Sequence, residues 1–547
     1  MPTEAADGPR EPFYLTTPIY YVNGEPHIGT AYTTIASDAV VRWMRMDGRD
    51  VHFLTGMDEH GQKVALAAAE HSMSPQEWCD SQVGQFTDLW ETLDISYDDF
   101  IRTTEDRHAR GVQKFMQALY DNGYLYKSTY DGFYCTPCET QFTAAELGKG
   151  RTCPDCGRPV EHIEEENWFF KLSEFSDKLL AYYDEHPDFV SPETRAHEVR
   201  SFVESGMHDL SVSRTAFDWG VPLPFDPSHV TYVWVDALIN YITAIGYGSD
   251  WGGGGSGAGC ESDGGSGAGC ESGGGEMFER YWPADFHFVG KDIIRFHCVI
   301  WPAMLMAAGL PVPKRVFAHG FLMASDGSKM SKSKGNALYP KEIIERYGVD
   351  AYRYYFLSDV TFGADGNIGH DRITQVYNAD LANSFGNLFS RVSNMTVKYF
   401  DGRVPAPAGG PSAVPAGNPL RASSEGLAGR VRSAMEGIDF GGAAGAVMEL
   451  VHAANLYVEE SAPWNLAKAG DADSLEELKV VIYSALEACR ISALLLAPFM
   501  PHAARELHRR MGLGDPNEVR DVEHAASWGG LPEGNAIEVG EPLFPRL

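Results

Sequence analysis

The sequence predicts a parallel α/β sheet that is split by an inserted domain and followed by an all-helical domain. Three observations support this prediction. Residues 13–61 contain a strand pattern, a glycine-containing turn, a helical pattern and a second strand pattern. Apolar strand patterns return near residue 229, after an interval with two close cysteine pairs, and amphipathic helical patterns dominate from residue 346. A chain of 547 residues is long enough for about three or four such units.

The first half of the sheet is predicted from two strands and the helix between them. FYLTTPIYYV at 13–22 is rich in β-branched and aromatic residues, and NGEPHIGTAYTTIASDAVVRWMRMDG then turns into a helical pattern. VHFLTGMDEHG at 51–61 is a second buried strand that ends in polar residues. Ligands of parallel α/β sheets bind beyond the carboxyl ends of the strands, so PHIGT and DEHG are candidate site segments.

The second half of the sheet has strand patterns of its own. VTYVWVDALINYI and DFHFVGKDIIRFH restore the α/β pattern, and VFAHGFL leads into a lysine-rich loop. Residues 252–275 contain GSGAGCES twice, a glycine-rich composition that cannot bury a core, so we expect a disordered surface loop there. The expected units are a first half of the sheet domain at 1–115, an inserted domain at 116–228 with a cysteine knuckle near 130–160, a second half at 229–345, a connecting segment at 346–375 and a helical domain at 376–547.

Charge and composition exclude several classes of protein. A formal net charge of -32 argues against broad, nonspecific nucleic-acid binding, although a local basic track remains compatible with it. The sequence contains no uninterrupted apolar stretch long enough to span a bilayer. The N-terminal MPTEAADGPREP is polar and acidic, unlike a signal peptide, so we expect a cytoplasmic protein without a membrane partner.

Four cysteines have the spacing of a zinc site. CTPC at 135–138 and CPDC at 153–156 form two CxxC pairs with fourteen residues between them. Four thiolates on two tight turns can surround one Zn²⁺ tetrahedrally, which leaves no open position for a water and indicates a structural role. Two disulfides and chance remain the alternatives. The candidate ligands are Cys135, Cys138, Cys153 and Cys156.

Two short motifs indicate an anion site. In PHIGT at 26–30, a glycine lets the backbone approach a phosphate, and the start of a helix supplies amide donors. Alone this motif is weak, since a histidine near a helix start can also be a cap or a packing residue. FLMASDGSKMSKSKGN at 321–336 places Lys329, Lys332 and Lys334 close together in an acidic chain, although a lysine run can also be a solvated, flexible loop.

PHIGT early and KMSKS late in one split α/β domain resemble the two signature motifs of the class I aminoacyl-tRNA synthetases. The resemblance implies that the lysine loop neutralises the charge that develops on pyrophosphate as ATP reacts. HIGT departs from the family, whose first motif normally ends in a second histidine; Thr30 cannot carry a positive charge. The resemblance implies ATP contacts at His27, Gly29, Gly290, Asp292, Lys329, Ser331, Lys332 and Ser333, with His27, Thr30, Lys329 and Lys332 as catalytic residues.

More extensive blocks resemble the methionyl-tRNA synthetase family, in its order. They are TTPIYYVNGEPHIG, LTGMDEHGQK, the cysteine knuckle, SRTAFDWGVPLP, YVWVDALINY, HFVGKDIIRFH, KMSKSKGN, NSFGNLFSR and APWNLAK. The resemblance implies a methionine site in which Asp58 pairs with the ammonium group and aromatic walls surround the thioether. The implied methionine-binding residues are Ile19, Tyr21, Asp58, Trp234, Ala237, Tyr241, Ile293 and His297.

The same resemblance implies an anticodon site in the helical region. Asn387 and Arg391 are four residues apart and share a helix face, and an exposed Trp464 could stack on an unpaired base. A tryptophan buried in a helix bundle is the alternative interpretation of Trp464. The implied anticodon residues are Asn387, Arg391, Pro463 and Trp464.

The resemblance implies a cytoplasmic enzyme that ligates methionine to initiator and elongator methionine tRNA through methionyl-adenylate. Mg²⁺ would accompany ATP, and one structural Zn²⁺ would bind per chain. Because the chain ends soon after the helical region, we expect a monomer. Three alternatives remain: a synthetase for another apolar amino acid, a noncatalytic tRNA-binding relative, and a structural zinc-ribbon protein, which would not explain the paired ATP motifs.

Overall fold

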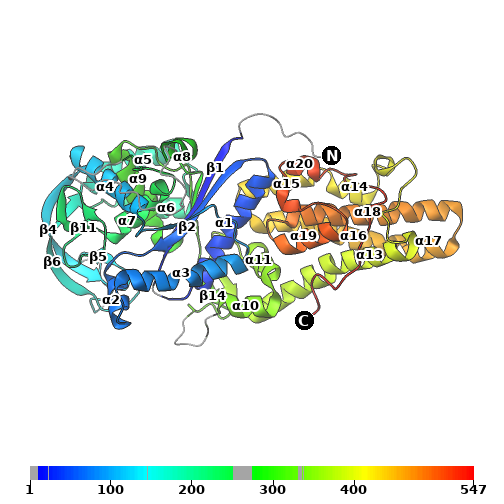
Figure 1. Cartoon of the computed structure of the whole chain (residues 1–547), viewed down its shortest axis with the longest axis horizontal. Coiled ribbons are helices and arrows are strands. Elements are labelled where there is room, and N and C mark those ends of the chain that lie inside the picture. Colours follow the sequence, from blue (N-terminus) through cyan, green and yellow to red (C-terminus); the bar gives the residue numbers. More distant parts are fainter. Residues whose placement is uncertain are drawn as a thin grey trace, which may run out of the picture.

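The computed structural model of the chain describes residues 10–22, 24–144, 146–148, 150–154, 156–250, 274–330, 336 and 338–547. The molecule is elongated, with the sheets in one half and a bundle of helices in the other (Figure 1). Helix α1 (Ile28–Met46) lies between the two halves and is buried along nearly its whole length. Its small and apolar residues, as in IGTAYTTIASDAVV, suit a helix that is packed on several sides.

The largest sheet has six strands in the order β3-β2-β1-β12-β13-β7, and every pair in it is parallel. This confirms the predicted parallel sheet and its split, because β1 and β2 come from the start of the chain while β12 and β13 follow the insertion. Alternate residues of β1 enter different cores: Phe13 and Leu15 on one face, Tyr14 on the other. The strands are β1 (Pro12–Tyr21), β2 (Asp50–Asp58), β3 (Asp99–Arg102), β7 (Val190–Ser191), β12 (Phe286–Gly290) and β13 (Val316–His319).

Strand β7 qualifies the expected boundaries of the insertion. It lies inside the range 116–228, yet it pairs with β13 at the edge of the parallel sheet. The chain therefore returns to the sheet for two residues within that range. A strand this short has no periodicity that a sequence pattern could reveal.

The inserted region contains two antiparallel sheets. The larger has the order β5-β4-β6-β8 and the smaller the order β10-β11-β9. The long antiparallel pair of β4 and β6 forms the outer end of the molecule in Figure 1. The strands are β4 (Leu125–Cys135), β5 (Thr140–Phe142), β6 (Glu161–Phe170), β8 (Leu210–Ser211), β9 (Ser213–Arg214), β10 (Pro222–Leu223) and β11 (Asp226–Thr231). A further parallel pair, β14 (Leu322–Ala324) and β15 (Gly366–Ile368), precedes the bundle.

The other regular elements of the described chain are helices. Ser74 and Glu77 form a reciprocal capping box at the start of α3, with Pro75 at its first position, as the local sequence favours. The remaining α-helices are α2 (Gln62–Glu70), α3 (Pro75–Thr92), α4 (Asp106–Asp121), α5 (Ser176–Glu185), α6 (Glu193–Glu204), α7 (Val233–Thr243), α8 (Gly274–Tyr281), α9 (Trp301–Ala308), α10 (Pro340–Tyr347), α11 (Val349–Ser358), α12 (His370–Val376), α13 (Asn387–Phe400), α14 (Pro419–Ser424), α15 (Leu427–Glu436), α16 (Phe440–Ser461), α17 (Pro463–Ala469), α18 (Ala472–Leu496), α19 (Pro501–Arg510) and α20 (Val522–Ala525). Single 3-10 turns occur at η1 (Leu172–Phe175), η2 (Lys291–Ile293), η6 (Pro411–Ala413) and η7 (Pro516–Glu518), and π-helical segments at η3 (Phe296–Ile300) and η5 (Tyr377–Gly386).

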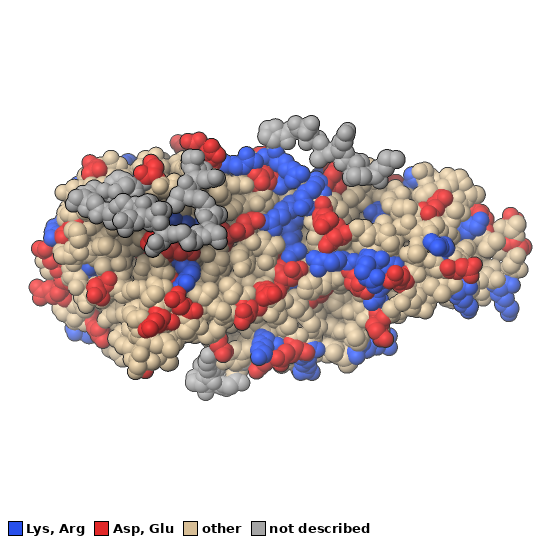
Figure 2. Space-filling view, viewed as in Figure 1, with Lys and Arg blue, Asp and Glu red and all other residues tan. Residues whose placement is uncertain are grey.

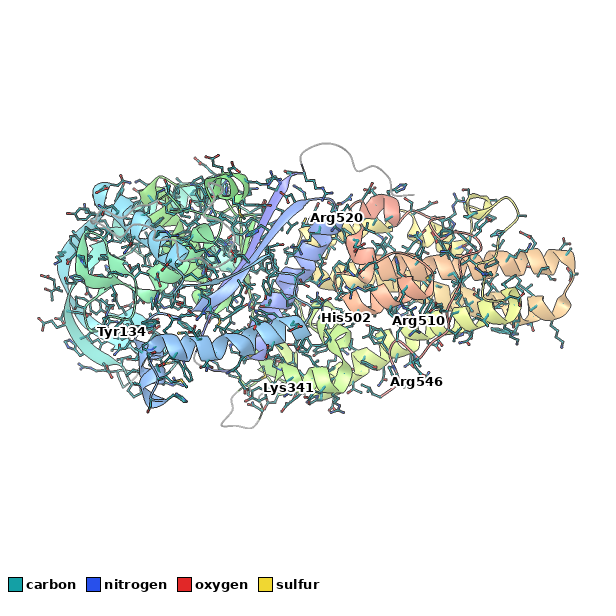
Figure 3. The ribbon with its side chains drawn as sticks, in the orientation of Figure 1. Tyr134, Lys341, His502, Arg510, Arg520 and Arg546 are labelled. Atoms are coloured by element: carbon teal, nitrogen blue, oxygen red, sulfur yellow. The ribbon has the colours of Figure 1, made fainter. Side chains whose placement is uncertain are left out.

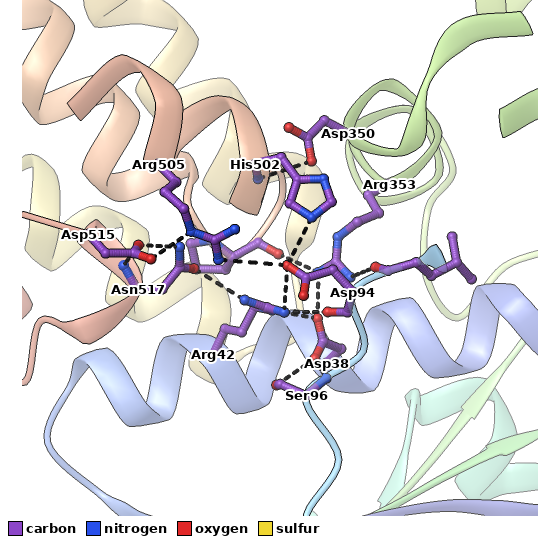
Figure 4. Close-up of polar contacts among 12 residues, drawn as sticks. Asp38, Arg42, Asp94, Ser96, Asp350, Arg353, His502, Arg505, Asp515 and Asn517 are labelled. Atoms are coloured by element: carbon purple, nitrogen blue, oxygen red, sulfur yellow. Dashed lines mark hydrogen bonds and ion pairs between the residues drawn. The ribbon is translucent and has the colours of Figure 1, made fainter. Parts of the chain in front are cut away.

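A buried ion-pair network joins the two halves at α1 (Figure 4). Arg353 of α11 and Asp38 of α1 are both fully buried, with Arg353 Nη2 2.6 Å from Asp38 Oδ2. Arg353 also donates to the backbone oxygens of Leu93, Pro498 and Phe499, so one guanidinium ties four segments together. The network continues into α19, where His502 Nε2 lies 3.3 Å from Asp94 Oδ2 and Arg505 Nε lies 2.6 Å from Asp515 Oδ2 (Figure 4).

Basic side chains gather across this junction on one face of the molecule, whereas acidic side chains are scattered (Figure 2). Arg520 lies there, near the top of the junction (Figure 3). Burial and the positive charges of Arg10 and Arg45 lower the pKa of Arg520, so these three groups are close enough to repel one another. Among the described residues, no helix combines the length and apolar composition that crossing a membrane requires.

Candidate active site

The carboxyl ends of β1 and β2 bring the first two candidate residues together. Their register pairs Tyr21 with Asp58 and Ile19 with Gly56, after a shift between Thr16 and Ile19. Asp58 is 2% exposed, and neither its Oδ1 nor Tyr21 Oη has a hydrogen-bond partner among the described residues. Two buried polar atoms without partners at a strand end indicate a polar ligand.

The electrostatic setting of Asp58 also suits a cationic ligand. Burial raises the pKa of Asp58 well above its usual value, and the negative charges of Glu139, Asp236 and Glu59 raise it further, while Lys63 opposes them. A positive group placed beside Asp58 would relieve this repulsion. The strand end is therefore prepared for an ammonium group.

Helix α7 places an aromatic face against the strand end that carries Tyr21 and Asp58. Trp234, Ala237 and Tyr241 are spaced i, i+3 and i+7, so they share one face of the helix. The ring of Trp234 lies edge-on to Tyr21, with 6.0 Å between centroids, and stacks on Phe296 at 4.1 Å. The structure thus brings Tyr21 and Trp234 together, as the resemblance implied.

A hydrogen-bonded pair links α7 to the segment that follows β12. Tyr241 Oη lies 2.7 Å from His297 Nε2, and His297 Nδ1 lies 3.0 Å from the Ile293 oxygen. Since a carbonyl only accepts, Nδ1 carries the hydrogen and Nε2 accepts from the tyrosine hydroxyl. Burial lowers the pKa of His297 to about 4, so the imidazole is neutral at pH 7. Ile19 and Ile293 are half-buried against the same core.

Sequence reasoning did not identify Phe296, which stacks on Trp234. Phe296 begins η3, where a π-helical turn replaces regular helix, and such turns are frequent at functional sites. The aromatic residue directly before His297 in IIRFH was the available signal. A regular 3.6-residue helical period could not show that Phe296 faces Trp234, because Phe296 lies in a π-helical turn.

The four cysteines form a compact cluster that fits one tetrahedral metal ion. Cys135 Sγ lies 3.6 Å from Cys156 Sγ, Cys138 Sγ lies 3.9 Å from Cys153 Sγ, and all four lie within 4.8 Å of one another. Four ligands about 2.3 Å from a tetrahedral Zn²⁺ would be about 3.8 Å apart. All four cysteines are free in this structure.

The knuckle also contacts the pocket, which sequence reasoning missed. Trp234 Nε1 donates to the Cys138 oxygen at 3.4 Å, and Tyr232 Oη donates to the Glu139 oxygen at 2.6 Å. The Glu139 carboxylate accepts from the Lys63 backbone nitrogen at 2.9 Å, at the start of α2. A Cβ on Gly61 would lie 2.5 Å from Glu139 Oε1, and the φ of Gly61 is +100°, a backbone conformation that favours glycine.

The first turn of α1 forms the second part of the candidate site. His27 caps the helix, with Nδ1 accepting from the Thr30 nitrogen at 3.2 Å, which leaves Nε2 for a ligand. Thr33, one turn further on, has Oγ1 2.7 Å from Nε2 of His319, at the end of β13. The α1 N-terminus therefore faces the carboxyl ends of β12 and β13.

Gly290 and Asp292 lie at the end of β12. Asp292 Oδ1 is 2.4 Å from the position of a Cβ on Gly290, so the carboxylate folds back over the glycine. The lysine loop begins with a turn in which Ala324 donates to the Ser328 oxygen at 2.9 Å, and Lys329 forms a bridge with Met323. Ser331, Lys332 and Ser333 lie outside the described residues.

Comparison with known proteins decides the family. The model for class I tRNA synthetases (M) matches residues 13–393, and the model for the anticodon binding domain of methionyl-tRNA ligase matches residues 406–547. The chain belongs to the methionyl-tRNA synthetase family.

Relatives and solved structures agree with this membership. A methionine-tRNA ligase of Caldanaerobacter subterraneus subsp. tengcongensis is 47% identical over 98% of this chain and 79% of its own length. One from Streptomyces coelicolor is 45% identical over 98% of this chain and 96% of its own. Mycobacterium tuberculosis methionyl-tRNA synthetase in complex with methionyl-adenylate superposes with a TM-score of 0.88 at 42% identity, covering 98% of this chain and 100% of that one. The split sheet followed by helices is thus the fold of this family.

The candidate anticodon residues lie in the helical half. Asn387 begins α13 and Arg391 follows one turn later, both half-buried. Pro463 begins α17, after Ala462 in a left-handed conformation, and α17 lies at the end of the bundle remote from the sheets (Figure 1). Trp464 is 45% exposed, which contradicts the buried alternative and leaves its ring available for stacking.

Proposed function

We propose that this chain ligates L-methionine to methionine tRNA with ATP, through methionyl-adenylate. In the first step, the methionine carboxylate attacks the α-phosphate, and pyrophosphate leaves. In the second step, a hydroxyl of the terminal tRNA ribose attacks the carbonyl of the adenylate, and AMP leaves. The observation that supports this best is the buried Asp58, whose Oδ1 has no partner among the described residues and whose register partner Tyr21 contacts Trp234 of α7.

Each end of methionine has its own group of residues in this proposal. The ammonium pairs with Asp58, whose repulsion from neighbouring carboxylates it relieves. The thioether lies against Trp234 and Tyr241, because an unbranched, polarizable side chain suits aromatic walls. Tyr21, Ile19, Ala237, Ile293 and His297 complete the pocket, with the neutral His297 holding the Tyr241 hydroxyl.

ATP lies between the first turn of α1 and the lysine loop. His27 Nε2 and the backbone at Gly29 face its phosphates, and Asp292 with Gly290 holds the ribose. Lys329 and Lys332 neutralise the departing pyrophosphate, Ser331 and Ser333 orient the loop, and Mg²⁺ accompanies the nucleotide. No covalent intermediate with the enzyme is needed, because alignment and charge stabilisation lower the barrier.

The cysteine cluster would hold one structural Zn²⁺ through Cys135, Cys138, Cys153 and Cys156. Bound there, the metal would cross-link the two CxxC turns and supply no further chemistry. The knuckle carbonyls then support Trp234 and Tyr232. The knuckle therefore contributes to catalysis by positioning these two side chains.

Zinc content is directly testable. Metal analysis of the purified chain is expected to find about one zinc per chain, and chelation is expected to raise the methionine KM severalfold while the ATP KM changes little. The physical reason is the loss of the support that Cys138 and Glu139 give to the pocket. A folded, active chain without stoichiometric zinc would refute the assignment.

Methionine tRNA, both initiator and elongator, contacts the helical half at Asn387, Arg391, Pro463 and Trp464. The exposed indole of Trp464 supports stacking on an unpaired anticodon base, which needs no excess of basic charge. Charged tRNA is consumed by translation, so the cytoplasm is the compartment we propose. A monomer stays a prediction that sedimentation can test.

The decisive experiment is amino-acid-dependent ATP–pyrophosphate exchange with Mg²⁺, run with all twenty amino acids. Exchange with methionine alone would support the adenylate chemistry and the pocket together. Exchange with another apolar amino acid would reassign the substrate. No exchange, from folded and zinc-loaded protein, would favour a noncatalytic tRNA-binding relative.

Thr30→His tests the departure from the family's first motif. Thr30 occupies the first turn of α1, and its backbone nitrogen binds His27 Nδ1. A second imidazole there adds a donor toward phosphate, and a charge-assisted hydrogen bond contributes about 1.5–3 kcal/mol. We expect methionine exchange in both proteins and a lower ATP KM, by about threefold or more, in Thr30→His. An unchanged ATP response would show that position 30 does not contact ATP.

A further inference from the structure

A buried carboxylate with two histidine partners lies behind the methionine pocket. Asp236 of α7 is fully buried, and both of its oxygens are used. His60 Nδ1 lies 2.7 Å from Oδ2, and His108 Nε2 lies 3.1 Å from Oδ1. Burial alone would raise the pKa of Asp236, but the two imidazoles hold it at about 2, so the carboxylate is charged. We refer to His60, Asp236 and His108 as the buried bridge.

The buried bridge binds a different side of α7 from the one that carries the aromatic residues. Asp236, Asn240 and Thr243 are spaced i, i+4 and i+7, so they share one face, roughly a third of a turn around the helix from the face of Trp234, Ala237 and Tyr241. A group that holds the Asp236 face fixes the rotation and height of the helix. It thereby fixes where the Trp234 face meets a substrate side chain.

His60 links that grip to the ammonium end of the site. It follows Asp58 by two residues, directly beyond β2, so its bond to Asp236 ties the end of β2 to α7. Trp219 holds the same turn: its Nε1 donates to the Glu59 oxygen at 2.6 Å, and its ring contacts His60 edge-on. The turn that follows Asp58 is therefore attached to α7 through the buried hydrogen bond between His60 and Asp236.

His108 braces the buried bridge from α4. Its Nδ1 lies 2.8 Å from Thr243 Oγ1, and that hydroxyl donates to the Asn240 oxygen at 3.2 Å. Helices α4 and α7 approach closely at Gly111, where a Cβ would lie 2.2 Å from Thr243 Cγ2. Such close packing leaves little room for either helix to move.

We propose that the buried bridge is a positioning device that sets the spacing between Asp58 and the pocket face of α7, and so selects amino acids by length. This rests on the proposed function, since Asp58 and α7 must bind opposite ends of one amino acid. His60, Asp236 and His108 do not touch the substrate. They act by holding the two groups that do.

The test compares Asp236→Asn with Asp350→Asn in ATP–pyrophosphate exchange. Asparagine keeps the shape of Asp236 but loses its charge, so the buried bridge loosens. We expect the methionine KM to rise about tenfold while the ATP KM and zinc content stay unchanged. Preference for methionine over S-methylcysteine, one methylene shorter, is expected to fall, because one methylene is normally worth about 10–200-fold in discrimination.

Asp350→Asn is the matched control. Asp350 is also a buried carboxylate, 8% exposed, but it binds the Ala503 and His502 nitrogens at the start of α19, away from the pocket. It is expected to leave the methionine KM unchanged. An equal rise of the methionine KM in both variants, or none in Asp236→Asn, would overturn the proposal.

A second pair of variants keeps the test valid if Asp236→Asn does not fold. The amide nitrogen of His60→Asn can replace Nδ1 as a donor to Asp236, whereas His60→Ala cannot. We expect His60→Ala to raise the methionine KM and His60→Asn to restore it. Equal values in the two would contradict the positioning role. Absence of methionine exchange in the unmodified chain would instead refute the proposed function.

Discussion

Asp58→Asn is expected to reduce kcat/KM for methionine in ATP–pyrophosphate exchange by about a hundredfold or more. The variant keeps the shape of the buried side chain and removes the charge that pairs with the ammonium group. Loss of one partner from a buried, hydrogen-bonded charge pair costs about 2–5 kcal/mol. The effect should appear in methionine kinetics and leave the ATP KM close to that of the unmodified chain.

The same variant is expected to unfold at a higher temperature at neutral pH. Burial and neighbouring carboxylates raise the pKa of Asp58, so its ionisation opposes folding whenever the unfolded chain is ionised. The gain from asparagine is therefore present above about pH 4 and disappears below it, where both states are protonated. Thermal unfolding measured at neutral pH and again below about pH 4 tests this. The stability gained would show that Asp58 lowers the stability of the fold in return for substrate binding.

Asp88→Asn, on the exposed face of α3, is the control for both measurements. It should change neither kcat/KM nor the unfolding temperature. A methionine KM that is unchanged in Asp58→Asn would remove the carboxylate from the ammonium site.

Arg353→Met is expected to lower the free energy of unfolding by about 3–5 kcal/mol, because it leaves the fully buried Asp38 without one of its partners. Methionine retains much of the volume of arginine, so the loss reflects charge and hydrogen bonds rather than a cavity. Three segments also lose a common donor, since Arg353 binds Asp38 and the backbone oxygens of Leu93, Pro498 and Phe499. Urea denaturation, followed by the shift in midpoint, measures the effect.

The pH dependence of this destabilisation has a defined sign. Burial alone would raise the pKa of Asp38, but Arg42, Arg353 and the hydrogen bonds from Ser96 hold it well below its usual value. A carboxyl with a depressed pKa stabilises the fold above its unfolded pKa, about 3.9, and this contribution is lost as the pH falls through the folded value. The difference between Arg353→Met and the unmodified chain should therefore be larger at pH 7 than in acid.

Arg430→Met is the matched control. Arg430 pairs with Glu449 at 2.8 Å, but the two side chains are 49% and 67% exposed. An exposed pair contributes about 0–1 kcal/mol. Equal destabilisation by Arg430→Met and Arg353→Met would show that the buried junction network is not a special source of stability.

Several features of this protein follow from the sequence alone. The two CxxC turns have a spacing that brings four thiolates together, and the structure confirms a four-cysteine cluster. Strand, turn and helix periodicity predicted β1, α1 and β2, and collinear motifs predicted the family, which the comparisons confirm. These signals are readable because each arises within a short stretch of chain, where periodicity and spacing are local.

Only the tertiary structure decided how those stretches meet. Glu139 accepts from Lys63, Phe296 stacks on Trp234, and β7 joins the parallel sheet, and none of these has a local signature. Arg353 and Asp38 are 315 residues apart and form one fully buried pair. The physical reason is that burial and pairing energies depend on three-dimensional neighbours, which a periodic pattern does not specify. The sequence determined which groups are present, and packing determined which of them act together.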